Sequence, residues 1–280
     1  MTVRELLGVR VERVTDLGSS HSWTLHRAAL ADGREVFVKA AHGRGGVFAA
    51  EAAGLRWLAG AGPDAPVPEV LAADGHRLVL PWLPAEAPTA RAAERFGRDL
   101  AALHAAAPDA FGAPWDGFIA DLPLDNTPDP GPWPRWYAER RLAPFLRRAA
   151  RDLGGDGVRL VEKVIEGIDA LAGPPEPPAR IHGDLWSGNV LWTGGRAMLI
   201  DPAAHGGHRE TDLAMLALFG APHLQRIVAA YDEAAPLADG WRERIPLHQF
   251  HPLLVHVALF GSGYREQAVA ASRAALALPP

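Results

Sequence analysis

The chain has 280 residues, 48% of them apolar and 22% charged, so it can form a sizeable core and lacks the composition of a disordered protein. A net charge of −5 argues against a general nucleic-acid binder, and the absence of cysteine excludes disulfides, thiol catalysis and cysteine-ligated metal centres. The charged N-terminus has no signal-peptide core, and no uncharged apolar run approaches the roughly 20 residues that cross a bilayer. We therefore expect a cytoplasmic protein without membrane contact.

Residues 1–83 are expected to form a β-rich lobe with a single helix. Strands are predicted at residues 22–29, 35–40 and 76–80, and a helix at residues 47–58, from their apolar spacing. The Ala-Asp-Gly turn at residues 31–33 joins the first two strands as a hairpin. The run Pro-Trp-Leu-Pro at residues 81–84 indicates a rigid connector, so we place the lobe boundary between residues 83 and 84.

Residues 84–280 are expected to form a larger, mostly helical lobe. Helices are predicted at residues 91–107, 136–151 and 158–171, and a short strand at residues 198–200. Residues 108–134 are rich in proline, glycine and aromatic residues, which indicates a long ordered loop, and the remainder after residue 200 is expected to be helical. The fold class is therefore α+β, with a β-rich lobe followed by a helical lobe.

The most specific motif is His-Gly-Asp-Leu-Trp-Ser-Gly-Asn at residues 182–189, and Asp201 follows Asn189 by twelve residues. Phosphoryl transfer requires a carboxylate beside the attacking hydroxyl and hard oxygen ligands for Mg²⁺. Singly, Asp184 and Asn189 are also typical of loops and helix caps. Together with Asp201 they have the order and spacing used by kinases, so we predict Asp184 as the catalytic base and Asn189 and Asp201 as magnesium ligands.

A nucleotide site is predicted upstream of this motif. Lys39 lies on a predicted strand and is the single lysine of its lobe, and Glu51 lies on the predicted helix. Kinases hold the α- and β-phosphates of ATP with such a lysine, fixed by a helix carboxylate. The segment 16–22 lacks the G-x-G-x-x-G pattern, but its backbone amides and hydroxyls suit phosphate oxygens. The further candidates for nucleotide binding are Gly18, Ser19, Ser20, Ser22, Leu80 and Trp82.

Several histidines have spacings that resemble metal sites. These are His205 and His208, which lie near Asp212, and the pair His248 and His251. Zinc requires a third convergent ligand and a helix or turn that aims the ligands, and the two glycines at residues 206–207 supply no helix. We therefore expect no zinc site. His182 is expected to hydrogen-bond the backbone near Asp201.

These motifs, with Gly-His-Arg-Glu-Thr-Asp-Leu-Ala at residues 207–214 and Leu-Phe-Gly at 218–220, resemble the fructosamine kinase (ketosamine-3-kinase) family. That family belongs to the group of aminoglycoside phosphotransferases and choline kinases, and the resemblance runs along most of the chain. It implies a two-lobed protein-kinase-like fold and ATP- and Mg²⁺-dependent phosphorylation of the C3 hydroxyl of a fructosamine or ribulosamine. The phosphorylated product then decomposes and frees the amine, so the expected partner is a free or protein-bound glycated amine. The candidates to contact it are Trp186, His205, Arg209 and Glu210.

Two features depart from the family pattern. The phosphate loop is not glycine-rich and lacks the cysteine that some relatives carry, and His205 stands where the family often has tyrosine. Two alternatives remain open at this point: a related kinase for an aminoglycoside, choline or a hydroxy amino acid, and a nucleotide-binding pseudokinase. Trp186 can equally pack within the helical lobe. A monomer is the default expectation.

Overall fold

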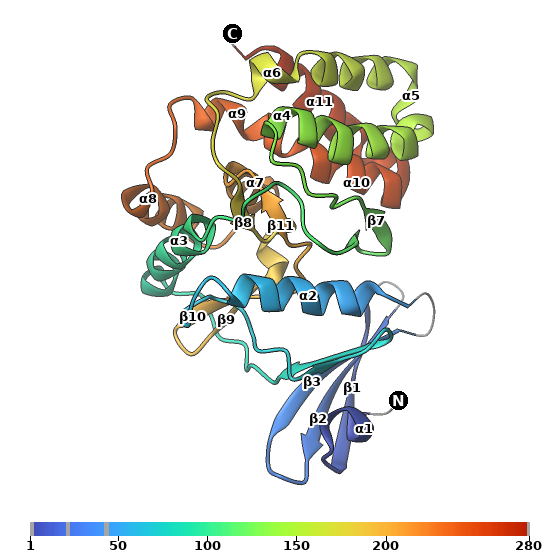
Figure 1. Ribbon diagram of the computed structural model, residues 1–280, viewed down its shortest axis with the longest axis vertical. Coiled ribbons are helices and arrows are strands. Elements are labelled where there is room, and N and C mark those ends of the chain that lie inside the picture. The colour runs from blue at the N-terminus through green and yellow to red at the C-terminus, as the bar shows by residue number, and fades with distance from the viewer. Residues whose placement is uncertain (1–2, 21–22, 42–44, 279–280) are drawn as a thin grey trace.

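The computed structural model describes residues 3–20, 23–41 and 45–278, and Figure 1 shows a sheet at the N-terminal end and a larger helical body beyond it. The main sheet is antiparallel and has the strand order β1-β2-β3-β5-β4. Gly33 has φ 85°, a conformation that glycine adopts without cost, and it completes the turn between β2 and β3. The strands are β1 (Val11–Ser20), β2 (Trp23–Leu30), β3 (Glu35–Ala41), β4 (Ala72–Ala73) and β5 (Arg77–Pro81).

Helix α2 (Val47–Ala59) lies between this sheet and the helical body (Figure 1). It buries Phe48, Ala52 and Leu55 completely in a hydrophobic cluster shared with both parts. A Cβ atom added at Gly54 would lie 3.2 Å from the Cβ of Ala204, so the lack of a side chain there lets α2 approach the segment after Asp201. Glu51 lies one helical turn before this close contact, which fixes its place against the second lobe.

The helical body consists of long helices interrupted by three small two-stranded sheets. The paired strands are β6 (Gly117–Ile119) with β7 (Leu122–Leu124), β8 (Ala179–Ile181) with β11 (His205–Gly207), and β9 (Val190–Thr193) with β10 (Arg196–Leu199). Its helices are α3 (Ala90–Ala105), α4 (Trp133–Tyr137), η1 (Ala138–Leu142, a π-helix), α5 (Ala143–Glu166), α6 (Ile168–Leu171), η2 (Ser187–Asn189, a 3₁₀ turn), α7 (Glu210–Leu218), α8 (Leu224–Ala234), α9 (Trp241–His248), α10 (Phe250–Phe260), η3 (Gly261–Tyr264, a 3₁₀ turn) and α11 (Arg265–Leu276). The short helix α1 (Val3–Leu7) packs on the main sheet instead.

Five local predictions need correction. Residues 1–83 contain a second helix, α1, besides α2, and the strand β11 lies in the part after residue 200 that was expected to be helical. The segment 16–22 was predicted as a loop, but β1 continues through it to Ser20, with an irregular register between Asp16 and Ser19. The long loop at residues 108–134 contains the β6–β7 hairpin and the start of α4. The first of the two predicted helices starts earlier, at Trp133, and continues into α5 as far as the break at Gly154, whose φ of 70° is not helical. The second is divided at Gly167 between the end of α5 and α6. Glycine and proline indicated these breaks in regular structure but not the contacts that order the chain around them.

One hydrophobic cluster crosses the predicted lobe boundary. It joins Trp23 and Leu78 of the sheet with Phe96, Leu185 and Leu199 of the helical body. The division after residue 83 falls between β5 and α3, and it stays a proposal. In the described part of the chain, every helix is too short or too polar to cross a membrane.

Candidate active site

The segment between β8 and β9 carries Asp184 and Asn189 on one tight turn. The Asn189 side-chain amide donates to the Asp184 backbone oxygen at 2.8 Å and to its carboxylate Oδ2 at 3.1 Å. Gly183 has φ 81°, and a Cβ atom there would lie 2.4 Å from the backbone oxygen of Ala203, so only glycine fits. Because Asn189 uses its nitrogen on Asp184, its Oδ1 remains the atom suited to a cation.

The buried carboxylate of Asp212, at the start of α7, accepts hydrogen bonds from the backbone at the beginning of the same turn. Its two oxygens accept the backbone N–H groups of His182 at 2.7 Å and Gly183 at 3.0 Å. The ring of His104 lies 3.1 Å from the same carboxylate and is itself bonded to the Tyr231 hydroxyl at 2.8 Å. Burial by itself would raise the pKa of Asp212, but the bond from His104 and the other donors keep it below its ordinary value.

Asp201 follows β10 in a left-handed backbone conformation with φ 57°. Aspartate tolerates this region better than most residues. Two contacts fix the backbone just before Asp201. The Ile200 N–H donates to the backbone oxygen of Asn189 at 3.0 Å, and the backbone oxygen of Ile200 lies 2.9 Å from the ring nitrogen Nε2 of His182. The prediction that His182 binds backbone beside Asp201 is therefore confirmed.

Lys39, on strand β3 of the main sheet, contacts both Glu51 of α2 and Asp201 of the helical body. Its ammonium lies 2.9 and 3.0 Å from the two carboxylate oxygens of Glu51 and 2.5 Å from Oδ1 of Asp201, which is 162 residues away in sequence. The Lys39 side chain is almost fully buried, and Asp201 is 40% exposed. Burial raises the pKa of Glu51 against the opposing effect of Lys39, and the Asp201 carboxylate adds to the rise.

Acidic side chains outnumber lysine and arginine side chains among the described residues that line the cleft. Among the described lining residues, the carboxylates of Glu51, Asp184 and Asp201 face the single ammonium of Lys39. Desolvation, followed by the nearby Asp201 charge, raises the pKa of Asp184 to about 8. Carboxylate and amide oxygens are the ligands that Mg²⁺ prefers, and a divalent cation would offset the excess charge. The residues present therefore fit a magnesium ion held by Asn189 and Asp201.

These residues line a cleft of about 620 Å³ between the sheet and the helical body. Ser20 lines it too, whereas Gly18 and Ser19 lie further back on β1, where the Gly18 N–H donates to the Asp16 carboxylate at 2.8 Å. Ser22 falls outside the described residues. The other two candidates for nucleotide binding, Leu80 and Trp82, are not among the residues that line the cleft. Leu80 is buried in the core, and the ring of Trp82 lies 4.5 Å from the Arg27 guanidinium. Their role in nucleotide binding stays a prediction.

Four residues were predicted to contact the substrate that accepts the phosphoryl group. Of these four, only Trp186 lines the cleft, and it is 39% exposed. His205 is buried, with its Nδ1 bonded to the Ala203 oxygen and its ring against Trp136. Arg209 binds Glu176 through two nitrogens, at 2.7 Å each. The described contacts thus give His205 and Arg209 partners within the protein, and contact of these two residues with the substrate stays a prediction.

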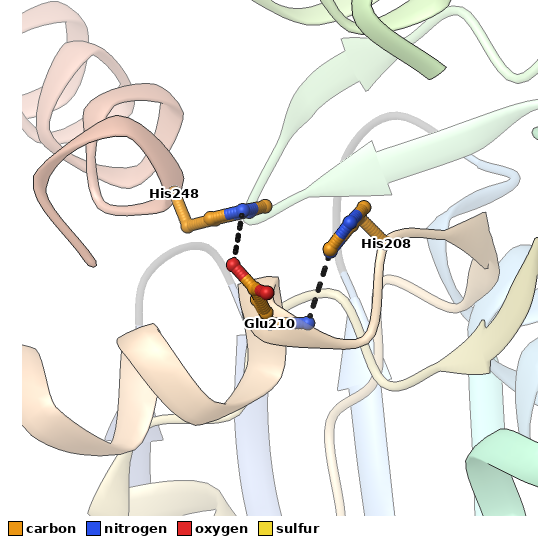
Figure 2. Close-up of side chains that lie close together, drawn as sticks. All are labelled: His208, Glu210 and His248. Atoms are coloured by element: carbon orange, nitrogen blue, oxygen red, sulfur yellow. Dashed lines mark hydrogen bonds and ion pairs between the residues drawn. The ribbon is translucent and has the colours of Figure 1, made fainter. Parts of the chain in front are cut away.

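Glu210 also lies away from the cleft, in a buried cluster with His208 and His248 (Figure 2). Both Glu210 oxygens are taken by Arg244, at 2.5 and 3.0 Å, and His248 Nε2 lies 3.2 Å from one of them. Burial would raise the pKa of Glu210, but the contacts from His248 and Arg244 lower it to about 2. These three side chains converge as metal ligands can, but a metal ion would have to displace the Arg244 guanidinium. We therefore interpret the cluster as an internal ion-pair network, and contact of Glu210 with the substrate stays a prediction.

The family model for fructosamine kinase matches residues 11–277. The chain belongs to the fructosamine kinase family. A protein of Synechocystis assigned provisionally as a ketoamine kinase is 37% identical over 234 residues, 79% of this chain and 76% of the relative. The crystal structure of a protein of Thermobifida fusca, assigned provisionally as a fructosamine-3-kinase, superposes with a TM-score of 0.95 and 57% identity over 99% of this chain and 97% of that one.

More distant structures share the fold of this fructosamine kinase family member. An aminoglycoside phosphotransferase variant solved with ADP and hygromycin B is 16% identical and has a TM-score of 0.66, over 97% of each chain. The two-lobed kinase-like fold and the resemblance seen in the sequence are both confirmed.

Sequence reasoning missed two groups that shape the site. Asp212 lies in the Gly-His-Arg-Glu-Thr-Asp-Leu-Ala block typical of the fructosamine kinase family, but it was considered only as part of a metal-like cluster. The second group is a set of aromatic residues that line the cleft beyond Trp186: Phe219, His256, Phe260 and Tyr264. His256 and Phe260 lie four residues apart on α10 and so share one face of that helix, which was the available signal, and Tyr264 follows at the end of η3.

Proposed function

We propose that this protein is an ATP-dependent kinase that phosphorylates the C3 hydroxyl of ketosamines such as fructosamines and ribulosamines, and so takes part in deglycation. The observation that carries the proposal is the contact of Lys39 with both Glu51 and Asp201, beside the Asp184–Asn189 pair, within one cleft. Side chains from two distant segments of the chain lie together there, which supports a phosphoryl-transfer site.

In the proposed reaction Asp184 accepts the proton of the acceptor hydroxyl as its oxygen forms a bond to the γ-phosphorus of ATP. The bond from that phosphorus to the β,γ-bridging oxygen breaks, and ADP leaves with the bond electrons. Asp184 accepts this proton in its ionised form, which a cation held beside it by Asn189 and Asp201 would favour. Asn189 keeps the Asp184 carboxylate oriented through the 3.1 Å hydrogen bond.

Lys39 would hold the α- and β-phosphates, and Glu51 keeps its ammonium in place when the nucleotide draws it from Asp201. Asn189 and Asp201 would hold Mg²⁺, which when bound supplies charge neutralisation for the phosphates. We also propose that residues 1–83 form the nucleotide lobe and residues 84–280 the catalytic and acceptor lobe.

The test is an assay of the purified protein with ATP, Mg²⁺ and a set of ribulose- and fructose-derived amines, with the phosphorylated position mapped by NMR. Loss of the base in Asp184→Ala is expected to lower kcat by about 10²- to 10⁴-fold while ATP still binds. The control is Asp156→Ala, on α5, whose side chain is 83% exposed. Turnover of Asp184→Ala within tenfold of the wild type would remove Asp184 from the mechanism, and phosphate on another hydroxyl would refute the C3 assignment.

A further inference from the structure

The end of the cleft beyond Asp184 is lined by five aromatic side chains. We call this set the aromatic wall: Trp186, Phe219, His256, Phe260 and Tyr264. Three of its rings remain open to solvent, since Trp186 is 39%, Phe219 41% and Phe260 55% exposed. Large apolar side chains left this exposed inside a cleft indicate a ligand surface.

The rings of the wall form a continuous path that starts beside the proposed base. Trp186, two residues after Asp184, lies 6.3 Å from Phe219, and Phe219 lies 5.2 Å from His256, measured between ring centroids. His256 in turn lies 5.6 Å from Phe260 and 4.8 Å from Tyr264. An acceptor with one hydroxyl at Asp184 would therefore extend along this path.

The wall contains an acceptor atom but no carboxylate. The described acidic residues of the cleft lining are Glu51, Asp184 and Asp201, and none of them belongs to the wall. His256 Nδ1 lies 2.7 Å from the Pro252 backbone oxygen, which can only accept, so Nδ1 carries the proton. Burial lowers the pKa of His256, which keeps the ring neutral and leaves Nε2 as a lone-pair acceptor.

We propose that the aromatic wall is the subsite for the protonated amine of the ketosamine and its substituent. This inference rests on the proposed function and names the part of the acceptor that the site recognises. C1, which carries the amine, is separated from C3 by one carbon, so a sugar with its C3 hydroxyl at Asp184 brings the ammonium to the wall. The ring faces attract the cation, and His256 Nε2 accepts its N–H. The apolar part of the substituent lies toward the exposed ring of Phe260.

The experiment compares two acceptors of the same shape, a fructose that carries a butylamino group at C1 and the corresponding butyl ether. The ether lacks the charge and the N–H, so the wild type is expected to prefer the amine by about tenfold in kcat/KM. His256→Asn can keep a donor near Pro252 but loses the Nε2 acceptor, and is expected to reduce this preference to about threefold or less. His256→Gln places an amide oxygen near the Nε2 position and is expected to restore part of it.

His223→Asn is the matched control, since His223 is exposed and has φ 56°, a conformation that asparagine accepts. This variant should keep the full preference. Equal kcat/KM for amine and ether in the wild type, or an equal loss with both acceptors in His256→Asn, would overturn the proposed subsite.

Isothermal titration of both acceptors, with and without a non-hydrolysable ATP analogue, separates this inference from the proposed function. Tighter binding of the amine without phosphorylation of either compound would support the subsite and contradict the kinase assignment. Phosphorylation of both compounds with equal binding would support the kinase and refute the subsite.

Discussion

Replacing Glu210 by glutamine tests whether the buried network of Figure 2 stabilises the helical body. Glu210 is 2% exposed, and its pKa is lowered from 4.5 to about 2 by contacts with His248 and Arg244 that outweigh burial. A shift of this size corresponds to about 3 kcal/mol of folding free energy, because each pKa unit is about 1.4 kcal/mol. Since the folded pKa is depressed, this stabilisation is complete well above pH 4.5 and is lost as the pH falls toward 2.

The assay is urea unfolding of the wild type and Glu210→Gln at pH 7, 5 and 3.5. The variant is expected to be less stable by about 3 kcal/mol or more at pH 7, because it also leaves the Arg244 guanidinium buried without its anion. The difference should be nearly the same at pH 5 and about 1 kcal/mol smaller at pH 3.5, where part of the wild-type effect has been titrated.

The exposed Glu243 on α9 supplies the control, and Glu243→Gln should change stability by less than about 0.5 kcal/mol. The double variant with Arg244→Leu should recover part of the loss, because the uncompensated buried charge is then removed. A loss below 1 kcal/mol at pH 7, or a difference that does not shrink between pH 5 and pH 3.5, would refute the reasoning.

Two further predictions concern the supports of the proposed active site. Lys39→Arg puts a planar guanidinium where a compact ammonium contacts Glu51 and Asp201. We expect kcat/KM for ATP to fall by about 10- to 100-fold. An unchanged kcat/KM would show that Lys39 does not hold the nucleotide. Asp212→Asn keeps only one of the two oxygens that accept the backbone N–H groups of His182 and Gly183. We therefore expect kcat to fall about tenfold or more while KM for ATP changes little. A change in KM alone would contradict a role of Asp212 in positioning the turn.

Much of the proposed site is local in sequence, and that part was predictable. The turn that carries Asp184 and Asn189 spans few residues, so its own hydrogen bonds bring the two side chains together. Lys39 was identified for a different reason, since it is the only lysine of its lobe and its strand precedes a helix with a carboxylate. Matching residue types at such spacings also indicated the fold.

Side chains that depend on long-range packing were not predictable in this way. Arg209 and Glu210 are charged residues within a family motif, and only the folded chain shows that Glu176 pairs with the partly buried Arg209 and that Arg244 pairs with the buried Glu210. Their pairing is required because an unpaired buried charge is costly, but the sequence does not say which distant charge supplies it. The same holds for Phe260: a helix pattern can show that aromatic residues share a face, but whether that face meets the core or an open cleft depends on what packs beside it.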